Sequence, residues 1–372
     1  MYKFSALLLS SLVLSSAVLA ADPGDRSLVS TGAAHSMAVR ADGSLWTWGA
    51  NTSNQLAVSG SYKSTPQYTG LTGIISVSAG YLYSMAIDSD GAVWAWGVNS
   101  SGQLGLGDTT DRSSPTVLTA IDNVVALSNG QTHSLALRED GTVWAWGSGS
   151  TGQLGMGNTN SSSTPAQVPG LSNVVAISTG LYSSYALTAD GQVYGWGSNG
   201  YGNLGLGSYG DKTSPTLISS LSNVVGIASG AHHAIAVLAD GTVKAWGGNY
   251  SGQVGDGTTT ARTSPTLIAG LSNVVAVAAG SSHTLVRTAG GSVYSWGSNG
   301  NGQLCVAGSG QLAPVLVGSG YTGISTTSNS AFTFLRNGSG GLFGCGNNWS
   351  GQLGHGTFDA GSFTPTAVTA TW

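Results

Sequence analysis

The stretch NVVALSNGQTHSLALREDGTVWAWGSGSTGQLGMG, residues 123–157, decides the fold. It opens on Val124–Leu127, a short apolar run between turn residues, which is typical of a buried strand. Two further strand-like runs, His133–Arg138 and Thr142–Trp146, flank Asp140-Gly141, a pair that favours a tight hairpin because it tolerates positive φ. No part of the stretch has a sustained 3.6-residue period, so the unit is predicted to consist of strands.

The same unit recurs along the chain. A fourth strand is predicted at Pro115–Leu118 and its copies, where proline stands at the start, as an edge strand allows. The clearest mark of the repeat is W-x-W-G, whose closing glycines are 48, 50, 50, 50, 50 and 49 residues apart. The copies, intact in the first three units and modified in the others, are Trp46–Gly49, Trp94–Gly97, Trp144–Gly147, Tyr194–Gly197, Lys244–Gly247, Tyr294–Gly297 and Phe343–Gly346.

Seven such units, each with four strands, predict an all-β, seven-bladed β-propeller, in which radial repetition leaves only short strand edges. A single domain over residues 21–372 is expected. Ser27–Val29 enters the repeat in the middle of a unit, where it matches the Val124–Leu127 strand, and Thr364–Val368 matches the fourth strand that the first unit then lacks. From this phase we expect the C-terminal strand to pair with the N-terminal blade and so close the ring.

The elements G-x-x-H-S-x-A-L, D-G-x-V-W-A-W-G and G-Q-L-G-x-G resemble the regulator of chromosome condensation repeat family, and the resemblance covers Ser27 to Val368. It implies the seven-bladed propeller but not one function. The family's roles include guanine-nucleotide exchange on a nuclear GTPase, ultraviolet sensing in plants, modules of ubiquitin ligases and secreted bacterial inhibitors of β-lactamase. We expect the secreted bacterial propellers to be the nearest analogue, because residues 1–20 have the composition of an export signal and the sequence shows no basic segment suited to chromatin.

Composition limits the classes of partner. The chain has 11 Lys and Arg against 15 Asp and Glu among its 372 residues. Nucleic-acid binding needs a basic face, which so few scattered cations do not provide. With 41% hydrophobic residues and a net charge of −4, the chain does not have the composition of a disordered protein either.

Met1–Ala20 is interpreted as a signal peptide, with Lys3 as its only charge, an apolar stretch from Phe4 to Leu19 and a cleavage site before Ala21. A membrane anchor is the weaker interpretation, because serines interrupt a stretch already short for a bilayer. No second apolar run of spanning length exists in the sequence. We expect an exported monomer, in the periplasm or outside the cell.

Cys305 and Cys345 are the only cysteines. An oxidising compartment permits a disulfide between them. Two buried free thiols are the equal alternative.

The sequence provides no catalytic set, and we expect no enzyme activity and no cofactor. Glu139 is the only glutamate and lies on a predicted hairpin, while most aspartates belong to repeated turns or dispersed loops. Histidines share one repeat position, but facing sheets lie about 10 Å apart, whereas two nitrogens on one zinc lie within roughly 4 Å. A structural role is therefore predicted for His35, His133, His233 and His283.

Candidate binding residues are those at which the units differ, because loops carry function on a rigid scaffold. Seven large side chains stand in loops where other units have small or polar residues: Tyr81, Leu82, Leu181, Tyr182, Tyr201, Tyr250 and Trp349. For each of them, packing back onto a blade edge is the equal alternative.

The leading hypothesis is an exported, non-catalytic scaffold that binds another protein through this loop face, with inhibition of a secreted enzyme as its sharpest form. Carbohydrate binding by Tyr201, Tyr250 and Trp349 is the alternative. A polysaccharide-acting enzyme and an exchange-factor activity implied by the family resemblance rank below it.

Overall fold

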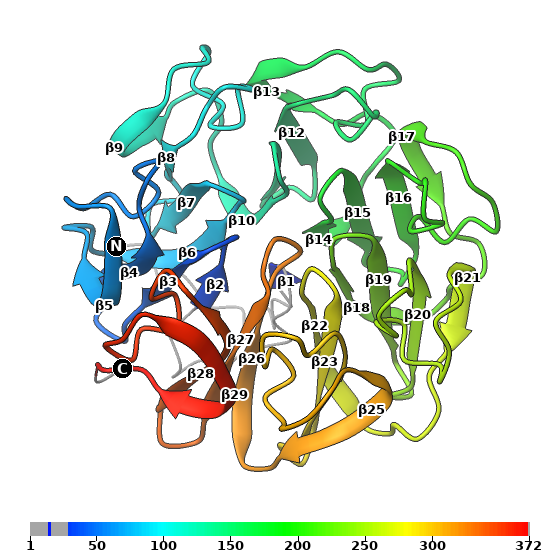
Figure 1. Cartoon of the computed structure of the whole chain (residues 1–372). Coiled ribbons are helices and arrows are strands. Elements are labelled where there is room, and N and C mark those ends of the chain that lie inside the picture. Colours follow the sequence, from blue (N-terminus) through cyan, green and yellow to red (C-terminus); the bar gives the residue numbers. More distant parts are fainter. Residues whose placement is uncertain (1–13, 16–28, 371–372) are drawn as a thin grey trace, which may run out of the picture.

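The computed structural model describes residues 14–15 and 29–370. Seven antiparallel sheets of four strands surround a central axis, which confirms the predicted propeller (Figure 1). Each sheet is made of four consecutive strands, the first nearest the axis and the fourth on the outside. A two-residue strand, β1 (Leu14–Ser15), pairs in parallel with the inner strand of the fourth blade. The rest of the predicted signal peptide lies outside the described residues.

The strands of each blade are given from the axis outward. The first blade consists of β2 (Val29–Thr31), β3 (His35–Val39), β4 (Leu45–Ala50) and β5 (Tyr62–Tyr68), and the second of β6 (Ile74–Ala79), β7 (Tyr83–Asp88), β8 (Val93–Gly97) and β9 (Arg112–Leu118). The third consists of β10 (Val124–Asn129), β11 (His133–Arg138), β12 (Val143–Gly147) and β13 (Ser162–Gln167), and the fourth of β14 (Val174–Thr179), β15 (Ser183–Thr188), β16 (Val193–Gly197) and β17 (Lys212–Leu217). The fifth blade consists of β18 (Val224–Ser229), β19 (His233–Leu238), β20 (Val243–Gly247) and β21 (Arg262–Leu267). The sixth consists of β22 (Val274–Ala279), β23 (His283–Thr288), β24 (Val293–Gly297) and β25 (Gln311–Gly318). The seventh consists of β26 (Tyr321–Ser325), β27 (Phe332–Asn337), β28 (Leu342–Asn348) and β29 (Asp359–Ala367).

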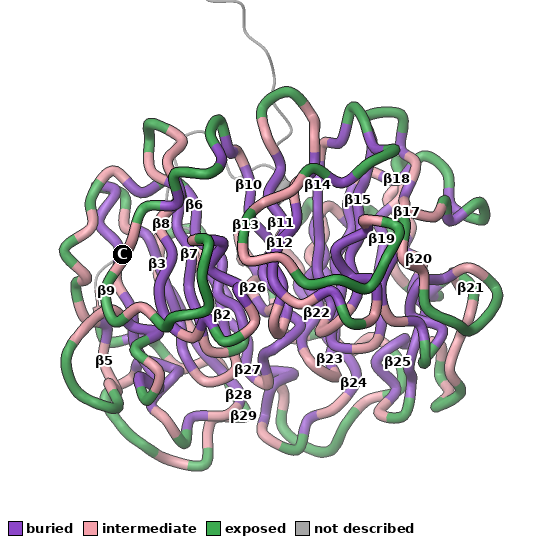
Figure 2. Tube along the Cα trace, turned by 90° about the horizontal axis from the view of Figure 1, so that it is seen from above, coloured by how far each residue is buried: buried purple, intermediate pink, exposed green. Residues whose placement is uncertain are grey.

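The core lies between the blades. The first three strands of each blade are mostly buried, and exposed loops cover both ends of the ring (Figure 2). A fully buried tryptophan from the third strand of each of the first six blades packs against its neighbour: Trp48, Trp96, Trp146, Trp196, Trp246 and Trp296. Each indole removes a large apolar area from water, so these residues stabilise the contacts between adjacent blades and do not form an aromatic binding site.

A repeated hydrogen-bond network joins adjacent blades. Trp146 Nε1 of the third blade donates to the carbonyl of Gln103 in the second at 2.8 Å, and Ser134 Oγ donates to the same carbonyl at 2.9 Å. His133 Nε2 lies 3.0 Å from the hydroxyl of Ser184 in the fourth blade. The repeated histidine is therefore structural, as predicted, and its partner is a hydroxyl of the next blade.

The ring closes without the strand exchange expected from the sequence. β29 pairs with β28 of its own blade, and β5 completes the first blade from its own unit. The closing seam instead repeats the contacts found between other blades: Trp48 Nε1 donates to the Gln352 carbonyl at 2.8 Å, and Gly356 N donates to the Ser64 carbonyl at 2.9 Å. The expected pairing was wrong because the long third connection of each unit returns the fourth strand to its own blade.

Cys305 and Cys345 form a disulfide, with Cα atoms 5.4 Å apart, between the sixth and seventh blades. Cys345 occupies the position of the repeated tryptophan, and Cys305 that of the glycine beneath it. At the equivalent Gly105, an added Cβ would lie 2.9 Å from Trp146 Nε1. Five of the other seams pair the tryptophan with glycine, and one pairs Trp96 with Ala57. In the seventh seam two bonded cysteines take these two positions.

No described helix is long and apolar enough to cross a membrane.

Candidate functional site

The order of antiparallel strands divides the loops between two mouths of the propeller. Connections from first to second strand and from third to fourth strand lie at one end, which we call the loop mouth. The Asp-Gly hairpins between second and third strands, and the links to the next blade, lie at the other end, which we call the hairpin mouth. All seven sequence-predicted residues lie at the loop mouth: Tyr81, Leu82, Leu181, Tyr182, Tyr201, Tyr250 and Trp349.

These seven side chains differ in their access to solvent. Tyr250 and Trp349 are 72% and 67% exposed, while Tyr81 and Tyr201 are 40% and 38% exposed. Leu82, Leu181 and Tyr182 are half-buried. The backbone carbonyls of Leu82 and Tyr182 accept hydrogen bonds from Val98 and Ser198, so these loop segments are held rigidly by their own blades.

Tyr201 and Tyr250 come together at the seam between the fourth and fifth blades. Their ring centroids lie 6.1 Å apart in an edge-to-face arrangement. Tyr201 also lies over the ring of His232, with centroids 4.3 Å apart. We call Tyr201, His232 and Tyr250 the aromatic cluster. Contacts of this kind fix the rings in place and leave much of Tyr250 free for a partner.

His232 was not identified from the sequence, although the signal was present. It precedes the repeated His233 at the position that holds Leu82 and Tyr182 in other units, so it is another unrepeated loop residue. Partial burial lowers the pKa of His232 below its usual value, because burial disfavours the charged imidazolium.

The loop that carries Tyr201 also differs from its copies. In other units a glutamine side chain accepts a hydrogen bond from the backbone N–H two residues earlier, as Gln253 Oε1 does from Ser251 N at 2.9 Å. Asn203 is one methylene shorter and donates to the Ser198 carbonyl at 2.7 Å instead. Its buried Oδ1 has no partner among the described residues. Tyr201 is therefore held less by its own loop and more by its contacts with the fifth blade.

The remaining predicted residues lie apart from this cluster. Tyr81 belongs to the second blade, and its carbonyl accepts a hydrogen bond from Ala33 N at 3.3 Å. Leu181 links the third and fifth blades through backbone hydrogen bonds to Gln131 and Ala231. Trp349 belongs to the seventh blade, which is not a neighbour of the fourth or fifth, so it does not join Tyr201 and Tyr250 in one platform.

Charges at the loop mouth are largely neutralised within the protein. Asp256 pairs with Arg262 at 2.5 Å, and Asp108 with Arg112 at 2.7 Å. The hydrogen bond from Arg112 is the main reason that the pKa of Asp108 lies below its usual value. Asp211 accepts the backbone N–H of Asn199 at 2.9 Å. The exposed aromatic rings therefore stand in surroundings of little free charge, which suits a partner with an apolar or aromatic contact surface.

The titratable groups at repeated positions do not form a reactive site. Burial lowers the pKa of His133 to about 4 and that of His233 to about 3, and neither imidazole is accessible to a substrate. Within the described ranges, no three His, Cys, Asp or Glu side chains are placed to hold a metal ion.

Solved structures of several known proteins are similar to this fold. Prp20p from Saccharomyces cerevisiae, described with its binding properties to Gsp1p and histones, is similar at a TM-score of 0.79 and 24% identity, covering 88% of this chain and 86% of that one. Human WBSCR16 has a TM-score of 0.78 and 24% identity, covering 88% and 95%. The CRINKLY WD40 ectodomain of the Arabidopsis thaliana receptor kinase ACR4 has a TM-score of 0.53 and 16% identity, covering 89% and 94%.

At these identities the likeness is one of fold. No curated protein matches the sequence. The family model described as the RCC1-like domain matches residues 15–332, most of the chain. With the seven-bladed architecture and the repeated tryptophan and histidine positions, this match shows that the chain belongs to the RCC1-like domain family.

Proposed function

We propose that this protein is an exported, non-catalytic scaffold that recognises another protein through its loop mouth. The observation that carries the proposal is the gathering of exposed aromatic side chains at one mouth, with Tyr201, His232 and Tyr250 in mutual contact. Aromatic side chains are enriched at the energetic centres of protein interfaces. Export rests on the composition of residues 1–20.

A rigid scaffold favours this use of the loops. The seams beneath the loop mouth are fixed by buried tryptophans and repeated hydrogen bonds, so little conformational freedom remains to be lost when a partner binds. Because nearby carboxylates are already paired or hydrogen-bonded within the protein, the partner is expected to bring apolar and neutral polar contacts. The family resemblance to secreted inhibitors makes an exported enzyme the sharpest candidate partner.

Carbohydrate binding remains the alternative at this mouth, and it applies to Tyr201 and Tyr250 alone. A sugar could stack on the exposed face of Tyr250, but Trp349 is on a distant blade and would contact a separate ligand. The protein interpretation is stronger because it uses aromatic residues on several blades at once.

The proposal is tested by capture of envelope and secreted proteins on the chain beginning at Ala21. A matched variant carries Tyr201→Ala and Tyr250→Ala, and a control carries Leu267→Ala and Phe363→Ala, two exposed apolar residues on outer strands. The expected result is one dominant partner that is retained by the control and reduced at least tenfold by the loop-mouth variant. Equal capture by all three forms would contradict recognition through the cluster.

A further inference from the structure

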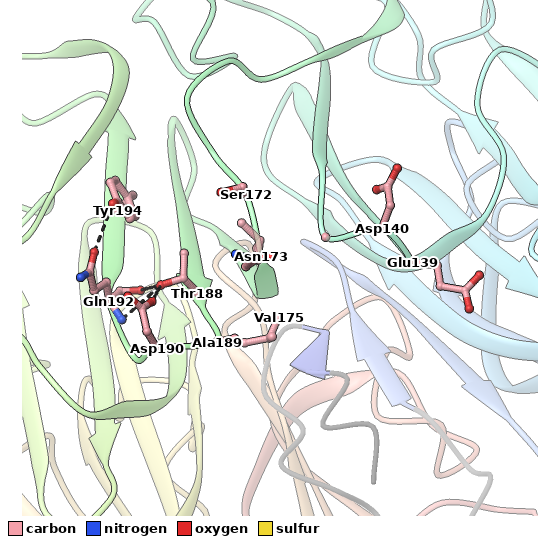
Figure 3. A pocket seen from close by; sticks show the side chains of 12 residues that line it. Glu139, Asp140, Ser172, Asn173, Val175, Thr188, Ala189, Asp190, Gln192 and Tyr194 are labelled. Atoms are coloured by element: carbon pink, nitrogen blue, oxygen red, sulfur yellow. Dashed lines mark hydrogen bonds between the residues drawn. The ribbon is translucent and has the colours of Figure 1, made fainter. Parts of the chain in front are cut away.

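A second, chemically different site lies at the hairpin mouth. A crevice of about 530 Å³ opens between the third and fourth blades (Figure 3). Glu139 and Asp140 lie on one side of it, and Asp190, Gln192 and Tyr194 on the other, with Ser172 and Asn173 between them. A volume of this size is within the range of small-molecule sites.

The internal repeat shows which residues of the crevice are specific to it. The corresponding seam between the fifth and sixth blades keeps the threonine and tyrosine, as Thr288 and Tyr294. It has Ala239, Gly290 and Ser292 where the crevice has Glu139, Asp190 and Gln192. Glu139 is the only glutamate of the chain, and four other units have alanine at its position. The hairpin forms without these groups, so the turn itself does not require them.

Several polar groups of the crevice are unused by the fold. Among the described residues, the side chains of Glu139, Ser172 and Asn173 have no hydrogen-bond partner. Asp190 Oδ1 accepts the Thr188 hydroxyl at 2.5 Å, which leaves the other carboxylate oxygen available. Gln192 Oε1 accepts the Tyr194 hydroxyl at 3.2 Å, which leaves the amide N–H groups free to donate.

The charges and hydrogen-bonding groups of the crevice indicate which class of ligand it can bind. Carboxylates line the crevice and no Lys or Arg does, so a phosphate, sulfate or uronate would be repelled. No three of the carboxylates are placed to hold a metal ion. An ammonium group only donates hydrogen bonds, so it would offer no acceptor to the amide and hydroxyl donors of Gln192, Asn173 and Ser172. A sugar hydroxyl both donates and accepts, and so matches both kinds of group.

We propose that the crevice between the third and fourth blades binds one or two residues of an uncharged, polyhydroxylated glycan. Glu139 and Asp190 accept hydrogen bonds from sugar hydroxyls on opposite sides, and Gln192 and Asn173 donate to them. Tyr194 provides an apolar edge for the C–H face of a sugar ring. The site is separate from the loop mouth, and the protein could hold a glycan at one mouth and a protein at the other.

The test is binding of the folded chain to immobilised neutral oligosaccharides of glucose, galactose, mannose and N-acetylglucosamine, with oligogalacturonate and spermidine as charged comparators. Glu139→Ala with Gln192→Ser gives two of the three distinctive positions of the crevice the residues of the fifth and sixth blades and keeps Asp190. We expect at least one neutral oligosaccharide to bind, and its affinity to fall at least tenfold in this variant. Tyr201→Ala with Tyr250→Ala should leave that binding unchanged, which separates this site from the loop mouth.

A converse variant controls for folding defects. Ala239→Glu, Gly290→Asp and Ser292→Gln transfer the polar set to the seam of the fifth and sixth blades, where a Cβ on Gly290 would meet nothing within 4 Å. This variant should bind the same oligosaccharide with a second site per molecule. Binding of none of the neutral sugars, or of spermidine or oligogalacturonate alone, would overturn the proposal.

Discussion

Four buried histidines make the stability of the ring sensitive to acid. Burial lowers the pKa of His35, His233 and His283 to about 3 and that of His133 to about 4, whereas unfolded histidine titrates near 6.5. The unfolded chain therefore takes up protons first. The free energy of unfolding should therefore keep its highest value above about pH 6.5. It should fall as the pH decreases toward 4, by about 1.4 kcal/mol per pH unit for each histidine.

Urea unfolding at a series of pH values measures this directly. His133→Gln is the matched variant: it loses stability at pH 7, because the bond to Ser184 is disturbed, but its slope between pH 6 and 4.5 should be shallower by about 1.4 kcal/mol per pH unit. Parallel slopes for the two proteins would show that His133 does not titrate as the burial requires.

At the scale of the elements, the disulfide between β28 and the loop before β25 takes the place of a tryptophan–glycine contact, and we expect the two arrangements to be interchangeable. Cys345→Trp alone should be strongly destabilising, because Cys305 carries a side chain at the position where even an added Cβ on the equivalent Gly105 would lie 2.9 Å from Trp146 Nε1. Adding Cys305→Gly should recover a large part of the loss by restoring the tryptophan–glycine pair found in five of the other seams. Thermal unfolding of both single variants and the double variant gives the coupling between the two positions. Additive losses would contradict the exchange.

Reduction of the same disulfide tests its contribution. The bridge closes a loop with a sequence separation of 40, for which the chain-entropy model gives about 4 kcal/mol of stabilisation. We expect chemical unfolding under reducing conditions to begin at clearly lower denaturant, with the folded spectrum unchanged before the transition. The Cys305→Gly, Cys345→Trp protein serves as control, since a reductant should not affect it.

At the scale of the whole molecule, the repeat was sufficient to predict seven blades, because W-x-W-G fixes one third strand per unit. The pairing of the fourth strand was not predictable from spacing. Gln167 at the end of β13 is seven residues from Val174 of the next blade, but β13 pairs with β12, whose last residue, Gly147, is fifteen residues before Ser162. The phase of the repeat grouped the fourth strand with the blade that follows it in the chain, which was the wrong partner.

The candidate residues show the same limit. The sequence identified seven unrepeated loop residues, and the strand order of the structure places all seven at one mouth. The contact between Tyr201 and His232 depends on how closely two blades approach, which no pattern in one unit specifies. The disulfide was undecided for a similar reason, since sequence gives the number of cysteines but not the distance between them.

The closing seam offers a prediction at this scale. A chain ending at Phe358 lacks β29 and should lose amide protection in β28, its pairing partner, while β4 and β5 of the first blade stay protected. Hydrogen exchange measures both segments in one experiment. Loss of protection in β4 would mean that the C-terminal strand completes the first blade after all.

The most direct test of the central claim is site-specific photo-crosslinking at the loop mouth. A photoreactive phenylalanine analogue replaces Tyr250 in one protein, Ala189 at the hairpin mouth in a second, and Leu267 on an outer strand in a third. The account predicts that position 250 alone crosslinks efficiently to the partner protein captured by the unmodified chain. Crosslinking of that partner from position 189 or 267, with none from position 250, would contradict recognition through the loop mouth.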